Sequence, residues 1–157
     1  YEGTTAIQAN DLVGRKTVRD GGQLARGVAA QIEQTEAELR ASEGNAAYAD
    51  QLKAAREAYL AVVDFMAAQG KGDPNAAYAG SVPYLMLAGN LVAGWQMGRA
   101  LLAAERLLQA GQDAGFMRAK IATARFYGDH ILVRTQALRD AVLQGSASVM
   151  ALAIDDF

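Results

Sequence analysis

The spacing of apolar side chains constrains the fold of this chain more than any other feature of its sequence. Between residues 112 and 144 these side chains recur at steps of four and three, at Met117, Ile121, Ala124, Gly128, Ile131, Thr135, Leu138 and Val142. That spacing places them on one face of a single long helix. Residues 45–68 repeat the pattern at Tyr48, Leu52, Ala55, Tyr59, Val62 and Met66. Such a stripe faces a near-parallel or antiparallel neighbouring helix, as in a bundle.

The composition also favours helices, and glycine and proline divide the chain into segments of helical length. Alanine, which has the highest helix propensity, supplies 34 of the 157 residues, and no segment alternates apolar and polar residues as a strand would. The expected helices cover residues 4–19, 20–41, 45–68, 81–109 and 112–144, followed by a short last segment at 147–157. We therefore expect an all-α fold, an antiparallel helical bundle preceded by a short helical arm.

The segment 20–41 is expected to bury one face and to carry an ion pair on another. Asp20 is the expected N-cap. The expected buried face carries Leu24, Val28, Ile32, Thr35 and Leu39. Glu36 and Arg40 stand four residues apart, in the order that favours an ion pair along a helix.

The segment 81–109 contains an uncharged run at 82–98, so a membrane span has to be weighed against a buried helix. Polar residues and three glycines interrupt the run, and Arg99 ends it. These features favour a helix buried on most sides in the middle of a bundle, with Ser81 as its N-cap. Small residues four apart would let a neighbouring helix approach closely, at the pairs Gly89–Ala93 and Gly94–Gly98.

Charge and residue types exclude several function classes. The chain has 15 basic and 17 acidic residues, so no charge excess drives nucleic-acid binding. It has no cysteine, which excludes thiolate metal sites and thiolate nucleophiles. His130 is the only histidine, and we interpret it as a surface or interface residue and expect no metal site. Arg15, Lys16 and Arg19 are typical of a solvated helix end, and Trp95 of a helix–helix contact.

Two blocks of sequence resemble one enzyme family. The first block comprises Tyr1-Glu2-Gly3-Thr4, Ile7-Gln8-Ala9, Asp11-Leu12 and Gly14-Arg15-Lys16. The second comprises Tyr84-Leu85, Gly89, Gly94-Trp95, Arg99-Ala100, Ala103-Ala104, the stretch 120–127 and the closing stretch 145–157. In this order the blocks resemble the C-terminal signature and the extra C-terminal helical domain of the long bacterial branch of the acyl-CoA dehydrogenase family. Members of that branch act on 3-methylmercaptopropionyl-CoA and related acyl thioesters.

The resemblance implies oxidation of an acyl-CoA thioester at its α,β carbons to the 2-enoyl-CoA, with FAD as the acceptor. It assigns the catalytic base to Glu2, which would remove the α-proton, and it places Gly3 against the thioester. The FAD-binding residues that it implies are Thr4, Thr5, Ala6, Ile7 and Gln8. The residues themselves also suit the start of a helix, because Thr4 or Thr5 can cap it and free amides there favour anions.

The resemblance further implies two parts within the chain. Residues 1–19 would end the catalytic helical domain, and residues 20–157 would form an additional helical bundle. Since the family also needs an N-terminal helical domain and a β-domain, we expect this chain alone neither to bind FAD tightly nor to turn over substrate. An alternative from another class is a non-catalytic helical domain for subunit assembly or protein interaction.

The expected partners also follow from the resemblance. They are the acyl-CoA substrate, an electron-transferring flavoprotein or a similar acceptor, the remaining domains of the same enzyme and further copies in a homo-oligomer. Neither nucleic acid nor a membrane span is expected. The chain begins without a basic and then apolar leader, so the expected location is the cytoplasm.

Overall fold

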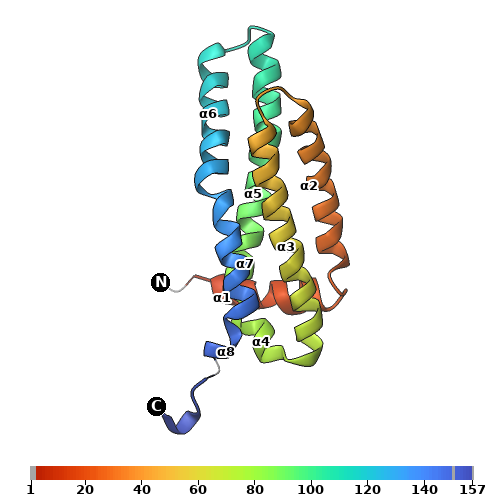
Figure 1. Ribbon diagram of the computed structural model, residues 1–157, viewed down its shortest axis with the longest axis vertical. Helices are drawn as coiled ribbons and strands as arrows, with labels where there is room; N and C mark the ends of the chain where they lie inside the picture. Colours follow the sequence, from red (N-terminus) through yellow and green to blue (C-terminus); the bar gives the residue numbers. More distant parts are fainter. Residues whose placement is uncertain (1–2, 150, 157) are drawn as a thin grey trace.

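The fold is a bundle of long helices that run alternately up and down, with a short helical arm across one end. The computed structural model describes residues 3–149 and 151–156. Its long helices are α2 (Gln23–Ala41), α3 (Ala46–Gly72), α5 (Ser81–Gln109), α6 (Ala114–His130) and α7 (Thr135–Gln144). Figure 1 shows α2 and α5 antiparallel to α3 and to the α6–α7 pair. The described residues contain no strand, which confirms the predicted all-α bundle with its arm.

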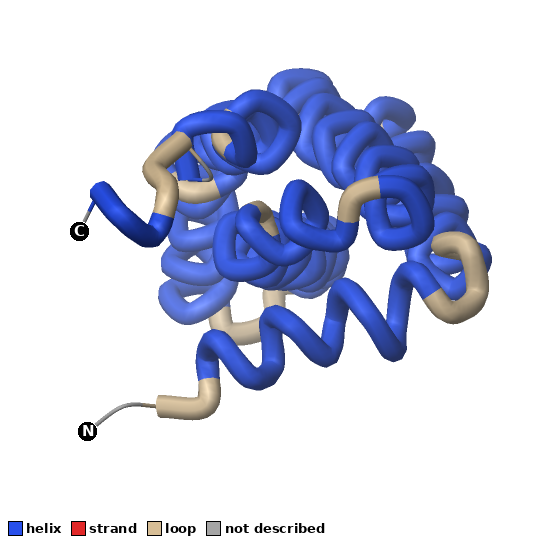
Figure 2. Tube along the Cα trace, turned by 90° about the horizontal axis from the view of Figure 1, so that it is seen from below, coloured by secondary structure: helices blue, strands red, loops and turns tan. Residues whose placement is uncertain are grey.

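Short helices complete the chain. The arm consists of α1 (Thr5–Asp11) and a π-helix, η1 (Leu12–Val18), which together span nearly the whole predicted helix 4–19. Seen from below in Figure 2, the arm runs along one side of the bundle, crosswise to the long helices that are viewed end-on. The remaining short helices are α4 (Pro74–Ala79), the 3-10 helix η2 (Leu132–Arg134), α8 (Ser146–Val149) and the 3-10 helix η3 (Ile154–Asp156).

The core forms where the stripe of α3 meets the other helices. All six stripe residues predicted between 45 and 68 are buried, at Tyr48, Leu52, Ala55, Tyr59, Val62 and Met66. Helix α5 faces them with a second buried row, at Tyr84, Leu87, Leu91, Leu101 and Ala104. Because the two rows come from antiparallel helices at similar spacing, their side chains interdigitate in one continuous core.

Helix α2 is rotated relative to the prediction. Leu24 is 74% exposed and Val28 is only partly buried, whereas Ala25 and Ala29 are buried in their place. The rest of the predicted stripe is buried as predicted, at Ile32, Thr35 and Leu39. The cause is the close approach of α2 to α3 at Gly22, which adopts a left-handed φ of 82°. A Cβ on Gly22 would overlap Val63 of α3, so this contact has no room even for the side chain of alanine.

The predicted N-cap of α2 is also displaced. Gly22, and not Asp20, occupies the cap position. The carboxylate of Asp20 still accepts hydrogen bonds from the backbone amides of Gly22 and Leu24, at 2.8 and 3.0 Å. Asp20 therefore accepts hydrogen bonds from backbone amides at the start of α2, although it lies two residues before the N-cap.

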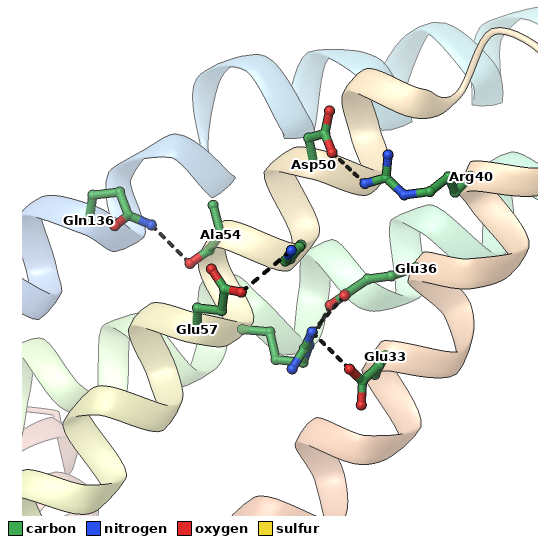
Figure 3. A network of polar contacts seen from close by, with 9 residues as sticks. Glu33, Glu36, Arg40, Asp50, Ala54, Glu57 and Gln136 are labelled. Atoms are coloured by element: carbon green, nitrogen blue, oxygen red, sulfur yellow. Dashed lines mark hydrogen bonds and ion pairs between the residues drawn. The ribbon is translucent and has the colours of Figure 1, made fainter.

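The predicted ion pair between Glu36 and Arg40 is wrong. Glu36 is buried and accepts two hydrogen bonds from the Arg56 guanidinium of α3, at 2.7 and 2.9 Å. Arg40 pairs instead with Asp50 of α3 (Figure 3). Both partners therefore join α2 to its neighbour, a choice that spacing along one helix cannot reveal.

Helix α5 has the predicted bounds, although its cap residue is Gly80 and not Ser81. The small pair Gly94–Gly98 packs closely, since a Cβ on Gly94 would overlap Leu132 and one on Gly98 would crowd Leu39 and Tyr48. At Gly89 the predicted close approach is wrong, because nothing lies within 4 Å of its Cβ position. No helix among the described residues combines the length and the apolar character that crossing a membrane requires.

The single helix predicted over 112–144 is also wrong, because the chain breaks after His130. Residues 132–134 form a 3-10 turn, and the Thr135 hydroxyl donates a hydrogen bond to the Leu132 carbonyl at 2.6 Å. The break turns Leu132 fully inward against Gly94 of α5. The predicted stripe survives the break, with Ala124, Gly128, Thr135 and Val142 buried.

Candidate functional site: the N-terminal arm

The described residues that are predicted to contact substrate and cofactor lie together at the exposed start of the arm. Gly3, Thr4, Thr5, Ala6, Ile7 and Gln8 are all exposed. Ile7, an apolar side chain, is 68% exposed. Glu2, the predicted catalytic base, lies outside the described residues. All six described residues of the predicted site are therefore accessible to solvent.

Helix α1 starts without a side-chain cap. Thr4 occupies the N-cap position, and its carbonyl accepts the first helical hydrogen bond from the Gln8 amide at 2.8 Å. Its side chain accepts no capping bond, so the expected threonine cap is absent. The first-turn amides of Thr5, Ala6 and Ile7 have no partner within the helix, as at every helix start. Backbone donors and hydroxyl groups therefore meet at the exposed end of the arm.

The opposite side of the arm is anchored in the core. Ala9, Val13 and Thr17 are completely buried, at successive steps of four residues. Where η1 crosses α3, a Cβ on Gly70 would overlap Val18, so the absence of a side chain on α3 allows the contact. Within the arm, Val13 is therefore buried, whereas Ile7 is exposed.

A buried hydrogen bond fixes the far end of the arm. The hydroxyls of Thr17 and Tyr84 lie 2.9 Å apart, and Thr17 also donates to the Leu12 carbonyl at 2.8 Å. The ring of Tyr59 stacks on Tyr84 with centroids 6.0 Å apart. Burial raises the pKa of the Tyr84 hydroxyl above its ordinary value, which keeps it protonated as a hydrogen-bonding group. Sequence reasoning missed this pair because 67 residues separate its members.

The charges of the arm are partly neutralised by one aspartate. The Asp11 carboxylate contacts the Arg15 guanidinium at 2.6 Å and the Lys16 ammonium at 3.3 Å. The hydrogen bond from Arg15, followed by that from Lys16, lowers the pKa of Asp11 to about 2. Since both cations are more than half exposed, the prediction of a solvated basic cluster is confirmed for them.

Other candidate positions lie away from the arm. His130 is exposed and packs against the Phe126 ring at 4.4 Å between centroids, which confirms a surface histidine. Within residues 3–149 and 151–156, no three acidic or histidine side chains gather as a metal site would require. A cavity of about 690 Å³ lies between α2 and α5 and includes Trp95 and Arg99 in its wall. None of residues 3–8 lines it.

Comparison with known protein families gives one match that covers most of the chain. The family described as acetyl-CoA dehydrogenase C-terminal like matches residues 28–153, from within α2 to the segment that follows α8. The chain belongs to this family. The match confirms the predicted resemblance to the C-terminal region of acyl-CoA dehydrogenases, and it lies wholly within the helical bundle.

Three curated relatives place this family member among named dehydrogenases. A 3-methylmercaptopropionyl-CoA dehydrogenase from Ruegeria pomeroyi is 50% identical over 98% of this chain and 26% of its own length. A broad-specificity linear acyl-CoA dehydrogenase from Mycobacterium tuberculosis is 32% identical over 97% of the chain and 26% of its length. A butyryl-CoA dehydrogenase from Syntrophomonas wolfei is 34% identical over 81% of the chain and 21% of its length. The chain thus spans about a quarter of the relatives that it matches.

Proposed function

We propose that this chain is the C-terminal part of an FAD-dependent acyl-CoA dehydrogenase, which converts an acyl-CoA thioester to the 2-enoyl-CoA. One observation carries the proposal: half of the residues are identical to a 3-methylmercaptopropionyl-CoA dehydrogenase over 98% of the chain. Because that match covers 98% of the chain, it extends into the arm and is not confined to the bundle.

Glu2 is the catalytic base in this proposal. An α-proton of a thioester is weakly acidic, so its removal needs a carboxylate at the Cα and hydrogen-bond donors at the carbonyl oxygen, where negative charge develops. Burial of Glu2 against substrate would raise its pKa toward the working range of a general base. Bound FAD would supply the acceptor for the hydride that leaves the β carbon. Gly3 would lie against the thioester, since the absence of a side chain permits close approach.

The described part of the arm suits contact with the edge of a dinucleotide. Thr4 and Thr5 carry hydroxyl groups, and the first-turn amides that follow them can donate to an anionic or polar group. Ala6, Ile7 and Gln8 add a small, an apolar and an amide side chain on the same exposed stretch. Because every residue from Gly3 to Gln8 is exposed, this stretch would supply only one wall of such a site.

That geometry leads to a prediction for the chain by itself. Dinucleotide sites bury most of their ligand, and an exposed six-residue stretch cannot do so. We expect FAD titrated into the 157-residue chain to show no tight stoichiometric binding and acyl-CoA to show no turnover. Tight binding at a ratio of one would contradict our assignment of the remaining flavin contacts to other domains.

Substitution of Glu2 tests the proposed chemistry in an intact enzyme that contains this chain. Glu2→Gln keeps the shape of the side chain but removes the base, so α-proton exchange should fall by about two to four orders of magnitude. The bound flavin should retain its absorbance spectrum. Glu43→Gln is the matched control, because Glu43 is exposed in the turn between α2 and α3. Exchange retained by Glu2→Gln would remove Glu2 from the role of base.

We also propose that the chain divides into an arm, residues 1–19, that completes the catalytic domain and a bundle, residues 20–157, that adds to it. The family match at 28–153 supports this division, since it falls within the second part. The two glycines at 21 and 22 have positive φ angles, 65° and 82°, and separate the arm from α2. Proteolysis at this turn should release a bundle that keeps its helical content.

Assembly is the second role that we propose for the bundle. Val82, Met86 and Val92 are each at least 40% exposed along α5, an apolar face suited to another protein surface. The partners that we propose are acyl-CoA, an electron-transferring flavoprotein or a similar acceptor, the remaining domains of the enzyme and further copies in a homo-oligomer. The cytoplasmic location of the protein also remains a prediction. Light scattering of the intact enzyme with Met86→Glu would test the face, and an unchanged mass would exclude it from the subunit contact.

A further inference from the structure

A groove lies between α2 and α5, and nothing in the proposed dehydrogenase chemistry uses it. Its volume of about 690 Å³ lies within the usual range for small-molecule sites. The lining is mainly polar: α2 contributes Gln31, Gln34 and Glu38, and α5 contributes Gln96 and two arginines. Such a lining suits a polar ligand better than the apolar face of another helix.

An aromatic ring stands in the wall of this groove in a fixed orientation. The indole N–H of Trp95 donates a hydrogen bond to the Thr35 hydroxyl at 2.8 Å, across the interface between α5 and α2. The Arg99 guanidinium lies 5.7 Å from the centre of the Trp95 ring. The ring therefore has its polar edge satisfied, and a cation already lies against it.

Two arginines give the groove a positive charge. Arg99 and Arg106 are seven residues apart on α5, so they lie on the same side of the helix about two turns apart. Among the described residues, neither guanidinium is within ion-pair distance of a carboxylate, and Arg99 donates only to the Gln96 side chain, at 3.1 Å. Glu38 is the one acidic residue in the lining. Arginine is the residue that matches the oxygens of phosphate groups best.

We propose that this groove binds an adenine nucleotide through its base and its phosphate groups. The base would lie beside Trp95, where the glutamine side chains can both donate to and accept from its edge. The phosphates would lie along α5 between Arg99 and Arg106. A free nucleotide and the nucleotide end of coenzyme A share this chemistry. The site does not depend on Glu2 or on FAD, so it stands or falls separately from the dehydrogenase reaction.

Trp95 is the only tryptophan in the chain, so its fluorescence reports directly on the groove. We expect ADP and coenzyme A, each titrated into the 157-residue chain, to change Trp95 emission in a saturable way. Inorganic pyrophosphate alone should bind more weakly, because it lacks the base. Tighter binding of coenzyme A than of ADP would identify the coenzyme as the source, and equal affinity would identify the free nucleotide. High salt should weaken both.

Three variants make the test specific. Arg99→Gln and Arg106→Gln should each weaken binding about tenfold, whereas Arg118→Gln, an exposed arginine on α6, should have no effect. Glu38→Gln should strengthen binding severalfold by removing a repulsive charge, a gain that misfolding cannot imitate. The proposal is overturned by the absence of a saturable change with either nucleotide, by unchanged affinity in both arginine variants, or by pyrophosphate binding as tightly as ADP.

Discussion

Two glycines of α5 give a sharp test of the packing described above. Gly89 and Gly94 are five residues apart in the interior of one helix, yet their surroundings are opposite. Nothing lies within 4 Å of a Cβ on Gly89, whereas a Cβ on Gly94 would overlap the buried side chain of Leu132. Replacement of each by alanine therefore changes helix propensity equally but packing in only one case.

The expected magnitudes follow from these surroundings. Alanine in place of glycine stabilises a helix interior by about 0.8–1 kcal/mol, so Gly89→Ala should raise the free energy of unfolding by about that amount. Gly94→Ala gains the same propensity but adds a methyl group to a filled core, which costs about 1–3 kcal/mol. The difference between the two variants isolates the packing cost, because the propensity gain cancels.

Urea denaturation monitored by circular dichroism measures both values, and an unchanged m-value would show that the unfolded states are comparable. For a chain of this size, each kcal/mol shifts Tm by about 2–4 °C, so the two variants should melt on opposite sides of the parent or differ by several degrees. In the Leu132→Ala background the penalty of Gly94→Ala should shrink. Equal stabilisation by both alanines would refute the close contact between α5 and the turn after α6.

Two electrostatic predictions follow from the same structure. Glu36→Ala leaves the nearly buried Arg56 with only the exposed Glu33 at 3.3 Å, so unfolding measurements should show a loss of about 2–3 kcal/mol, against less than about 1 kcal/mol for Glu33→Ala. Equal losses would contradict the burial of the pair. Carbon-detected NMR titration should give Asp11 a pKa of about 2, and Arg15→Gln should move it back toward 3.8. Because this folded-state pKa is lowered, the stabilisation is complete above pH 3.8 and is lost as pH falls toward 2.

The sequence correctly predicted helices that contact their neighbours through one straight stripe of side chains. The α3 stripe from Tyr48 to Met66 is buried as predicted, because both neighbouring helices pack along its whole length. The break after His130 was not predictable in the same way, since the residues at 131–134 contain no glycine or proline. It exists because Leu132 fills the space beside Gly94, a contact between positions 38 residues apart in the sequence.

Prediction of α2 failed for a related reason. Leu24 is more apolar than Ala25, so hydrophobicity alone places it inward, although it is 74% exposed. The start of α2 approaches α3 so closely at Gly22 that no side chain fits there. Steric fit between two helices thus overrides the apolar pattern of one, and only the pair of helices contains that information.

The candidate site has two parts, the exposed stretch from Gly3 to Gln8, which the family resemblance proposes, and the buried face of the arm that supports it, which the resemblance does not reveal. An α-helix turns about 400° over four residues, so a stripe at steps of four would drift by about 40° at each step. Residues 12–18 form a π-helix, whose wider turn reduces this drift, and Ala9, Val13 and Thr17 consequently remain on one buried face. The exposed residues from Gly3 to Gln8 continue directly from that anchored helix. The bundle therefore holds this stretch at a defined position on its surface, as the proposed site would require of its support.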